Sequence, residues 1–130
     1  MAWDVEYTNE FEAWWTELDA DERESVFASV GLLEEYGPQL PYPHSSDVKG
    51  SKSGKLRELR IQHDGRPFRV FYAFNPLRTG LLLIGGDKTG DDRFYERMIP
   101  IADALFKVHL DELRKEGKIH DGTQEVSRPR

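Results

Sequence analysis

The sequence predicts a single α+β domain, with helix-forming and strand-forming segments in separate parts of the chain. Its 130 residues fit one domain of ordinary size. Apolar residues recur at helical spacing near both ends, whereas residues 56–75 alternate around a central Asp64-Gly65 pair. The predicted order is therefore a strand, two helices, three strands and a last helix, without a second domain or an internal repeat.

The N-terminal region predicts a short strand and then two helices that form a hairpin. In residues 3–7, apolar residues alternate with acids, which places Trp3, Val5 and Tyr7 on one face. Thr8 or Asn9 can cap the first helix, and Asp19 or Asp21 the second. The side chains expected to be buried in the first helix are Phe11, Trp14, Trp15 and Leu18. Those expected in the second, which Gly37-Pro38 ends, are Val26, Phe27, Val30, Leu33 and Leu32.

Residues 38–54 predict a long loop. The segment holds three prolines followed by glycine, serine and lysine, without apolar periodicity. Loops of this length are often functional in compact domains, but an ordinary surface linker fits the composition equally well.

Asp64-Gly65 predicts a two-residue hairpin turn between strands 56–63 and 66–75. Such a turn sets the register, so His63 should face Arg66, and Arg60 should face Arg69. One face then carries the apolar residues that pack on helices, namely Leu59, Ile61, Phe68, Val70, Tyr72 and Phe74. The other face carries Arg60, Arg69 and Phe71, with Glu58 at its margin.

The C-terminal half predicts one more strand, one helix and a tail. Residues 79–85 are nearly all apolar, which is typical of a central strand covered on both faces. Residues 93–116 form the last helix, whose first turn Pro100 should kink or separate. Its inward residues are expected to be Ile101, Leu105, Val108, and Leu113 or Leu110. Residues 117–130 lack periodicity and predict a disordered tail, which leaves 1–116 as the domain.

Charge is distributed unevenly along the chain. The net charge is −6, yet residues 1–48 hold twelve acids and one base, and residues 49–97 hold eleven bases and six acids. This asymmetry favours a basic central sheet that contacts nucleic acid. An acidic helical half that only keeps a basic sheet in solution explains the same pattern.

The opposed arginines are the strongest candidate site residues. Like charges that face each other across a hairpin cost a few tenths to about 1 kcal/mol. A polyanionic ligand would reverse that cost, because phosphate accepts paired contacts from arginine. The alternative is that Arg60 and Arg69 pair with a neighbouring acid such as Glu58.

The segment GGDKTGDDRFYER, after the third strand of the sheet, adds further candidates. It places Lys88, Arg93, Tyr95 and Arg97 near one end of the sheet. A tyrosine beside cations can stack on a base or take part in proton transfer. It can equally complete the core of the last helix.

Metal, cofactor and membrane functions have no support in the sequence. The chain has no cysteine, and its histidines at positions 44, 63, 109 and 120 have no metal-ligand spacing. His63 can be a proton carrier near the arginines or, more simply, an exposed residue at the turn. The longest apolar run, 81–84, is too short for a membrane span, and residues 1–11 do not form a signal peptide. We therefore expect a cytoplasmic protein without cofactors.

Two stretches, KLRELRIQHDGRPFRVFYAFNP and LLLIGGDKTGDDRFYERMIPIADALFKVHL, resemble the phage-derived toxin family of the RelE/HigB/ParE toxin–antitoxin superfamily. The resemblance covers roughly residues 3–113. It implies a small twisted antiparallel sheet packed against two N-terminal helices, with a C-terminal helix. It also implies a HigB-like toxin: a metal-independent endonuclease of messenger RNA that acts on the ribosome, where the ribose 2′-hydroxyl attacks the adjacent phosphate.

The resemblance transfers catalytic roles to four residues. Arg69 stands in an aromatic–arginine–hydrophobic strand motif, and Arg60 in a basic position of the preceding strand. Lys88 follows the last strand, and Tyr95 matches a tyrosine important in RelE-like enzymes. Gln62 replaces a second basic residue of the family, and the general base stays unassigned. The other basic residues expected to contact RNA are Lys49, Lys52, Lys55, Arg57, Arg66, Arg93 and Arg97.

Two other functions fit the same sequence. One is a ParE-like inhibitor of DNA gyrase, and the other is a non-catalytic nucleic-acid-binding domain. For the toxin, the expected partners are the ribosome, messenger RNA and a helix-turn-helix antitoxin of the HigA type encoded by a neighbouring gene.

Overall fold

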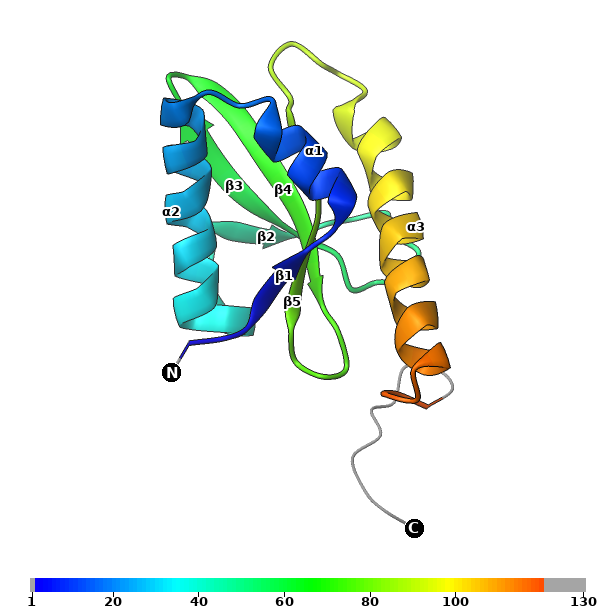
Figure 1. The fold of residues 1–130 in the computed structure, drawn as a ribbon. Helices are drawn as coiled ribbons and strands as arrows, with labels where there is room; N and C mark the ends of the chain where they lie inside the picture. The colour runs from blue at the N-terminus through cyan, green and yellow to red at the C-terminus, as the bar shows by residue number, and fades with distance from the viewer. Residues whose placement is uncertain (1, 121–130) are drawn as a thin grey trace.

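The computed structural model describes residues 2–120, which form three layers with a β-sheet in the middle (Figure 1). The elements in chain order are β1 (Val5–Tyr7), α1 (Asn9–Thr16), α2 (Ala20–Tyr36), η1 (Gly37–Gln39), β2 (Ser45–Asp47), β3 (Arg57–His63), β4 (Arg66–Phe74), β5 (Gly80–Asp87) and α3 (Phe94–Lys115). The α+β class and the order of the main elements are as predicted. None of the helices within this described part is both long and apolar enough to cross a membrane.

The sheet has the strand order β1-β5-β4-β3-β2. Neighbouring strands are antiparallel except β1, which lies parallel to β5. The sheet is therefore mixed, and the expectation of a purely antiparallel sheet was wrong at this edge. After β1 the chain passes through α1 and α2 and then forms β2, β3 and β4. It returns to the side of β1 with β5, which runs in the same direction as β1.

Two apolar cores cover the two faces of the sheet. One lies under α1 and α2 and includes Phe11, Val26, Leu33, Leu59 and Val70. The other lies under α3 and is built from residues of β4, β5 and α3. Adjacent residues of β5 point into different cores, which confirms that this strand is central and covered on both faces.

The β3–β4 hairpin has the predicted register. Arg60 pairs with Arg69, and His63 pairs with Arg66 beside the turn. Asp64 and Gly65 both have positive φ, 49° and 78°, as a two-residue turn of this hand requires. The apolar face that the alternation predicted, Leu59 through Phe74, packs under α1 and α2.

Two N-terminal caps were predicted correctly. The Thr8 hydroxyl accepts a hydrogen bond from the backbone N–H of Phe11 at 3.0 Å. Asp19 and Glu22 form a reciprocal capping box at the start of α2. The capped helices pack on the sheet, α1 against β5 and α2 against β3.

The predicted loop 38–54 contains two short elements, so that expectation was wrong in part. The turn η1 begins at Gly37, and β2 adds an edge strand whose Ser45 pairs with Leu59. The sequence of β2 is Ser-Ser-Asp, which lacks the alternation of apolar residues that marks a strand. It is held through buried Ser45, whose hydroxyl lies 2.6 Å from that of Tyr72.

The buried faces of the two long helices differ from those predicted. Phe27 is 70 % exposed on α2, and Ile101 and Val108 are exposed on α3. The core of α3 is instead made by Phe94, Met98, Ala102, Phe106, Leu110 and Leu113. The residues expected to be buried in α3 and those that are buried both recur at helical spacing. Periodicity alone therefore could not show that the set with the aromatic side chains packs on the sheet. Pro100 lies inside a continuous helix, without a separate first turn.

The described chain continues past the predicted domain end at residue 116. Ile119 is 3 % exposed and packs in the core under α3. The predicted disordered tail 117–130 thus includes a packed residue, and residues 121–130 of it lie outside the described part of the chain.

Candidate active site on the β3–β4 hairpin

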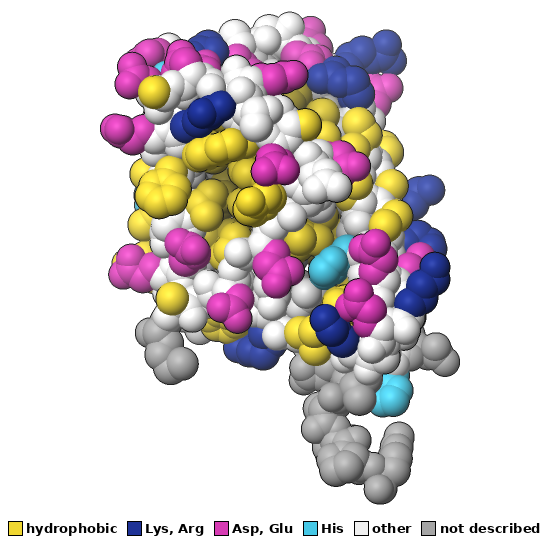
Figure 2. Space-filling view, in the orientation of Figure 1, with side chains coloured by type: hydrophobic (Ala, Val, Ile, Leu, Met, Phe, Trp, Pro, Cys, Tyr) yellow, Lys and Arg dark blue, Asp and Glu magenta, His cyan; other side chains and the backbone are white. Residues whose placement is uncertain are grey.

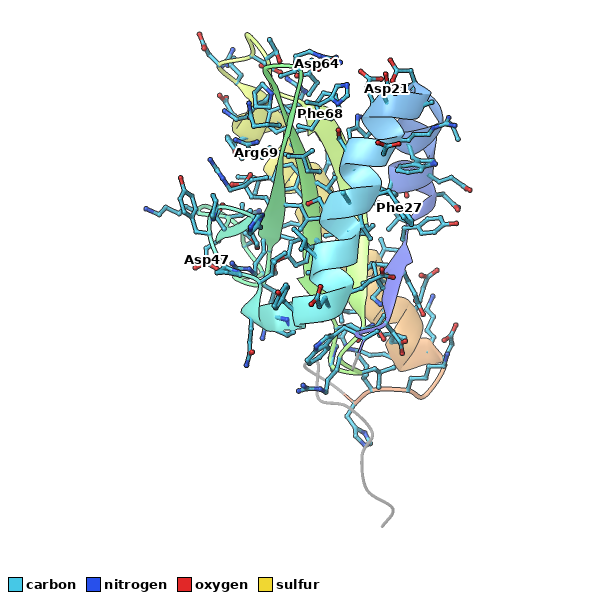
Figure 3. All side chains as sticks on the ribbon, turned by 90° about the vertical axis from the view of Figure 1, so that its left-hand side faces the viewer. Asp21, Phe27, Asp47, Asp64, Phe68 and Arg69 are labelled. Atoms are coloured by element: carbon cyan, nitrogen blue, oxygen red, sulfur yellow. The ribbon has the colours of Figure 1, made fainter. Side chains whose placement is uncertain are left out.

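The hairpin places three charged side chains on the α3 side of the sheet. Arg60 and Arg69 stand directly opposite each other, and Glu58 lies two residues before Arg60 on the same face. Figure 3 shows that Arg69 leaves the hairpin on the side away from α2. Alternation along β3 and β4 therefore gathers these charges on one face, while the apolar residues fill the other.

Arg69 is buried on the face of the hairpin that α3 covers. Its residue exposure is 5 %, because α3 covers this end of the sheet. The guanidinium donates a hydrogen bond to the carbonyl of Phe68 at 3.0 Å and another to the Tyr95 hydroxyl at 3.3 Å. Its Nε also lies 3.6 Å from Oε1 of Glu58. The expected repulsion between the arginines is therefore offset by a shared carboxylate, the alternative that the sequence left open.

Glu58 is at the centre of the group, although the sequence placed it at the margin. Oε1 accepts a 2.7 Å hydrogen bond from the Tyr95 hydroxyl, and Oε2 accepts one of 2.8 Å from the Ser46 hydroxyl. Oε2 also lies 3.7 Å from a terminal nitrogen of Arg60. The signal for its role was the spacing of two residues between Glu58 and Arg60, which makes them neighbours on one face.

Tyr95, in the first turn of α3, closes the group from above the sheet. Burial, followed by its hydrogen bond to Glu58, raises the pKa of the Tyr95 hydroxyl above its ordinary value. Lys88, just after β5, holds its ammonium 5.7 Å from the centre of the Tyr95 ring. We call Glu58, Arg60, Arg69, Lys88 and Tyr95 the Glu58 cluster. It combines three cations, one carboxylate and a neutral phenol.

The cluster borders an open pocket of about 300 Å³. Glu58 and Tyr95 line it together with Asp47, Val48, Lys49 and Ile99. Arg60 is more accessible than Arg69, with 29 % of its side chain exposed and its guanidinium 5.1 Å from the Tyr42 ring centre. Arg60 is therefore the more accessible of the two arginines, whereas the Arg69 guanidinium is already engaged by Phe68, Tyr95 and Glu58.

The other predicted RNA-binding residues are outside the cluster. Lys49, Lys52 and Lys55 are exposed in the β2–β3 connection, which the side chain of Asp103 on α3 holds through Ser51 and the Lys52 backbone. The four remaining arginines have acidic partners: Arg57 pairs with Asp47, Arg66 with Glu22 and Asp87, Arg93 with Glu96, and Arg97 with Asp91. Of the three lysines, Lys49 lines the pocket beside Glu58, whereas Lys52 lines a separate pocket against α3.

His63 lies on the opposite face from the cluster and is buried, so the expectation of an exposed turn residue was wrong. Its ring stacks on Phe68, and its Nδ1 lies 2.7 Å from the Ser25 hydroxyl. It joins the hairpin to α2. Over residues 2–120, no three metal-ligating side chains come together.

Comparisons with known proteins agree with the resemblance and with the fold. The family model described as "Phage derived protein Gp49-like" matches residues 13–107. Two similar proteins come from Mycobacterium tuberculosis. One, named "Putative toxin HigB2", is 39 % identical over 75 % of this chain and 50 % of its own length. The other, "Putative toxin HigB3", is 41 % identical over 71 % of this chain and 80 % of its own. The chain thus spans half the length of HigB2.

Solved structures with the same fold are those of RelE proteins. The free Escherichia coli toxin RelE, in a double arginine-to-alanine mutant, matches with a TM-score of 0.53 at 14 % identity, over 75 % of this chain and 96 % of RelE. RelE in the archaeal RelE–RelB complex from Pyrococcus horikoshii matches with a TM-score of 0.51 at 18 % identity, over 69 % and 99 %. These matches confirm a RelE-like fold.

Proposed function

The chain belongs to the Gp49-like family of phage-derived proteins, and on this premise we propose that it is the toxin of a toxin–antitoxin system that cuts messenger RNA on the ribosome. Its similarity to proteins named HigB toxins supports the toxin assignment. The observation that carries the nuclease assignment is the Glu58 cluster, in which polar side chains of β3, β4, the end of β5 and α3 meet, with Glu58 and Tyr95 lining a pocket.

The cations of the cluster serve the scissile phosphate in this proposal. Arg60 binds it from the accessible side, and Lys88 approaches from the end of β5. When the 2′-oxygen attacks phosphorus, negative charge grows on the phosphate oxygens, and fixed cations lower the energy of that state. The bond from phosphorus to the 5′-oxygen then breaks, and in this proposal Lys88 protonates the leaving oxygen.

Glu58 and Tyr95 divide the remaining roles. Because the pKa of Tyr95 is raised, its hydroxyl keeps its proton at neutral pH and acts as a hydrogen-bond donor. A neutral phenol is too weak a base to take the proton of the 2′-hydroxyl. The carboxylate of Glu58, which lines the pocket, is therefore our candidate for the base that sequence comparison left unassigned.

The proposed partners follow from the same surfaces. Lys49 lines the pocket, and Lys52 and Lys55 are exposed in the same β2–β3 connection; the three lysines would contact RNA through a salt-sensitive attraction to phosphates. RelE proteins are known in complex with RelB, which supports an antitoxin as the second partner. We propose a helix-turn-helix antitoxin of the HigA type, encoded next to this gene.

One observation favours the non-catalytic alternative. Arg69 already donates to a carbonyl and a hydroxyl, so part of the cluster has a structural role without any ligand. In that case the protein would bind RNA and leave it intact.

The decisive experiment maps the ends of messenger RNA after incubation with translating ribosomes and the purified protein. We expect discrete cuts with a 2′,3′-cyclic phosphate on one fragment and a 5′-hydroxyl on the other. Lys107→Met on the far part of α3 is the matched control and should cut as the wild type does. Intact messenger RNA with the wild-type protein would leave only the binding or gyrase-inhibiting functions.

A further inference from the structure

An apolar hollow of about 320 Å³ lies on the other face of the molecule, between α1, β1 and α2. Its walls include Tyr7 of β1, Trp15 of α1 and Phe27 of α2. Figure 2 shows apolar side chains gathered over this region, with acidic side chains around them. Neither the Glu58 cluster nor the β2–β3 connection contributes a residue to this hollow.

Phe27 and Tyr7 are far more exposed than aromatic residues of this size usually are. Phe27 is 70 % exposed and Tyr7 is 58 % exposed. Phe27 has the helical spacing of a core residue, yet it projects from the side of α2 that borders β1 (Figure 3). Contiguous exposed apolar surface of this kind marks an interaction site in soluble proteins.

Acidic residues border the hollow. Glu12 of α1 and Glu34 of α2 line it together with the aromatic side chains. Arg23 is the one base in residues 1–48, and its guanidinium is held by the carbonyls of Trp15 and Thr16. The rim therefore attracts a partner with basic residues on either side of an apolar surface.

The shape of the hollow fits a helix better than an added strand. β1 has three residues, which offers too short an edge for stable strand addition. Two helices flank the hollow, so apolar residues spaced three and four apart on a third helix can enter it.

We propose that this hollow binds an amphipathic helix of a partner protein, with apolar residues against Phe27, Tyr7 and Trp15 and basic residues against Glu12 and Glu34. The proposal rests on the proposed function in that the antitoxin is the partner. Since the hollow lies under α1 and α2 and the Glu58 cluster lies under α3, the bound helix leaves the cluster uncovered.

The test measures binding of the purified product of the adjacent reading frame. Phe27→Ser should weaken binding by about thirtyfold or more, as expected for a central aromatic contact. Val108→Ser removes another exposed apolar side chain, on α3, and should bind within about twofold of the wild type. Glu12→Gln with Glu34→Gln should weaken binding and flatten its dependence on salt. An unchanged urea midpoint for Phe27→Ser would show that the fold is intact.

Three results would overturn the proposal. The first is that Phe27→Ser binds the adjacent product with wild-type affinity, and the second is that the adjacent product does not bind at all. The third is that the wild-type protein forms a homodimer through this surface, which Phe27→Ser breaks. Variants of Arg60 and Lys88 should bind normally. Messenger RNA cleavage with a partner insensitive to Phe27 would refute this inference alone, and Phe27-dependent binding without cleavage would refute the proposed function alone.

Discussion

The two opposed arginines of the hairpin differ in burial, and this difference decides what each contributes. Arg69 is 6 % exposed at its side chain and Arg60 is 29 % exposed. Removing one member of a buried ion pair leaves the other unpaired, at a cost of about 3 to 5 kcal/mol. We therefore expect Arg69→Ala to lower the free energy of unfolding by about 3 kcal/mol.

Arg60→Ala is the matched comparison, because it removes the same side chain from the facing position. A partly exposed pair contributes little, so the loss should stay below about 1 kcal/mol. Urea unfolding of both variants under one set of conditions provides the measurement. Equal losses of stability would contradict the asymmetric placement of the two arginines around Glu58.

Tyr95 should titrate at higher pH than an ordinary tyrosine. Its raised pKa means that the folded protein favours the neutral phenol. The resulting stability is fully present below the unfolded pKa of about 10 and is lost as the pH rises from there through the folded pKa. Tyr95→Phe should remove this loss, as alkaline unfolding of both proteins would reveal. If the free energy of unfolding falls equally with rising pH in the two proteins, Tyr95 is not a partly buried phenol bound to Glu58.

At the scale of elements, α3 is tied to the β4–β5 turn through His109. The side-chain carbonyl oxygen of Asn75 accepts hydrogen bonds from the backbone N–H groups of Leu77 and Thr79. Its amide nitrogen therefore faces Nε2 of His109, 3.0 Å away, and donates to it. That nitrogen must be unprotonated, and burial lowers the pKa of His109 accordingly.

This contact predicts a loss of stability in mild acid. Because the folded pKa of His109 lies below the unfolded value of about 6.5, its contribution is present above that pH and is lost as the pH falls through the folded pKa. The free energy of unfolding should drop between about pH 7.5 and 5, and by less in His109→Gln. A pH dependence that His109→Gln leaves unchanged would assign the effect to other groups.

Alanine substitutions at two glycines should have opposite effects on stability, because only one of the glycines lies against another side chain. A Cβ at Gly85 of β5 would meet the Trp14 ring of α1 at 2.4 Å, whereas one at Gly31 of α2 would meet nothing within 4 Å. Gly85→Ala should cost about 1 to 3 kcal/mol through overpacking. Gly31→Ala should stabilise by roughly 0.5 to 1 kcal/mol, because alanine favours a helix. Thermal unfolding distinguishes the signs, and a neutral Gly85→Ala would mean that Trp14 does not pack there.

Local patterns predicted the hairpin well and the outer elements poorly. The Asp64-Gly65 turn determines register, so the Arg60–Arg69 pairing followed from counting residues. Strand β2 escaped prediction because its pairing depends on the distant Tyr72 hydroxyl. The burial of Arg69 escaped it too, since nothing in the hairpin shows which face α3 covers. The same missing information hid the central position of Glu58.

At the scale of the whole molecule, the charge split of the sequence becomes a division between faces. The acidic N-terminal helices cover one face and surround the hollow at Phe27. On the α3 side, Arg60, Arg69 and Lys88 gather around Glu58 and Tyr95, and Lys49 of the β2–β3 connection lines the pocket beside them. We therefore propose one face for a basic protein partner and the other for RNA, an arrangement in which neither partner covers the site of the other.

The central claim is that the Glu58 cluster cuts RNA, and a single-turnover rate tests it most directly. The variant Arg60→Ala with Lys88→Met removes the two accessible cations and should keep the fold, which the urea midpoint checks. On translating ribosomes it should cut messenger RNA at least about a hundredfold more slowly than the wild type, as expected when charge-stabilising groups are lost. A stably folded double variant that cuts at the wild-type rate would contradict the assignment of the cluster as the active site.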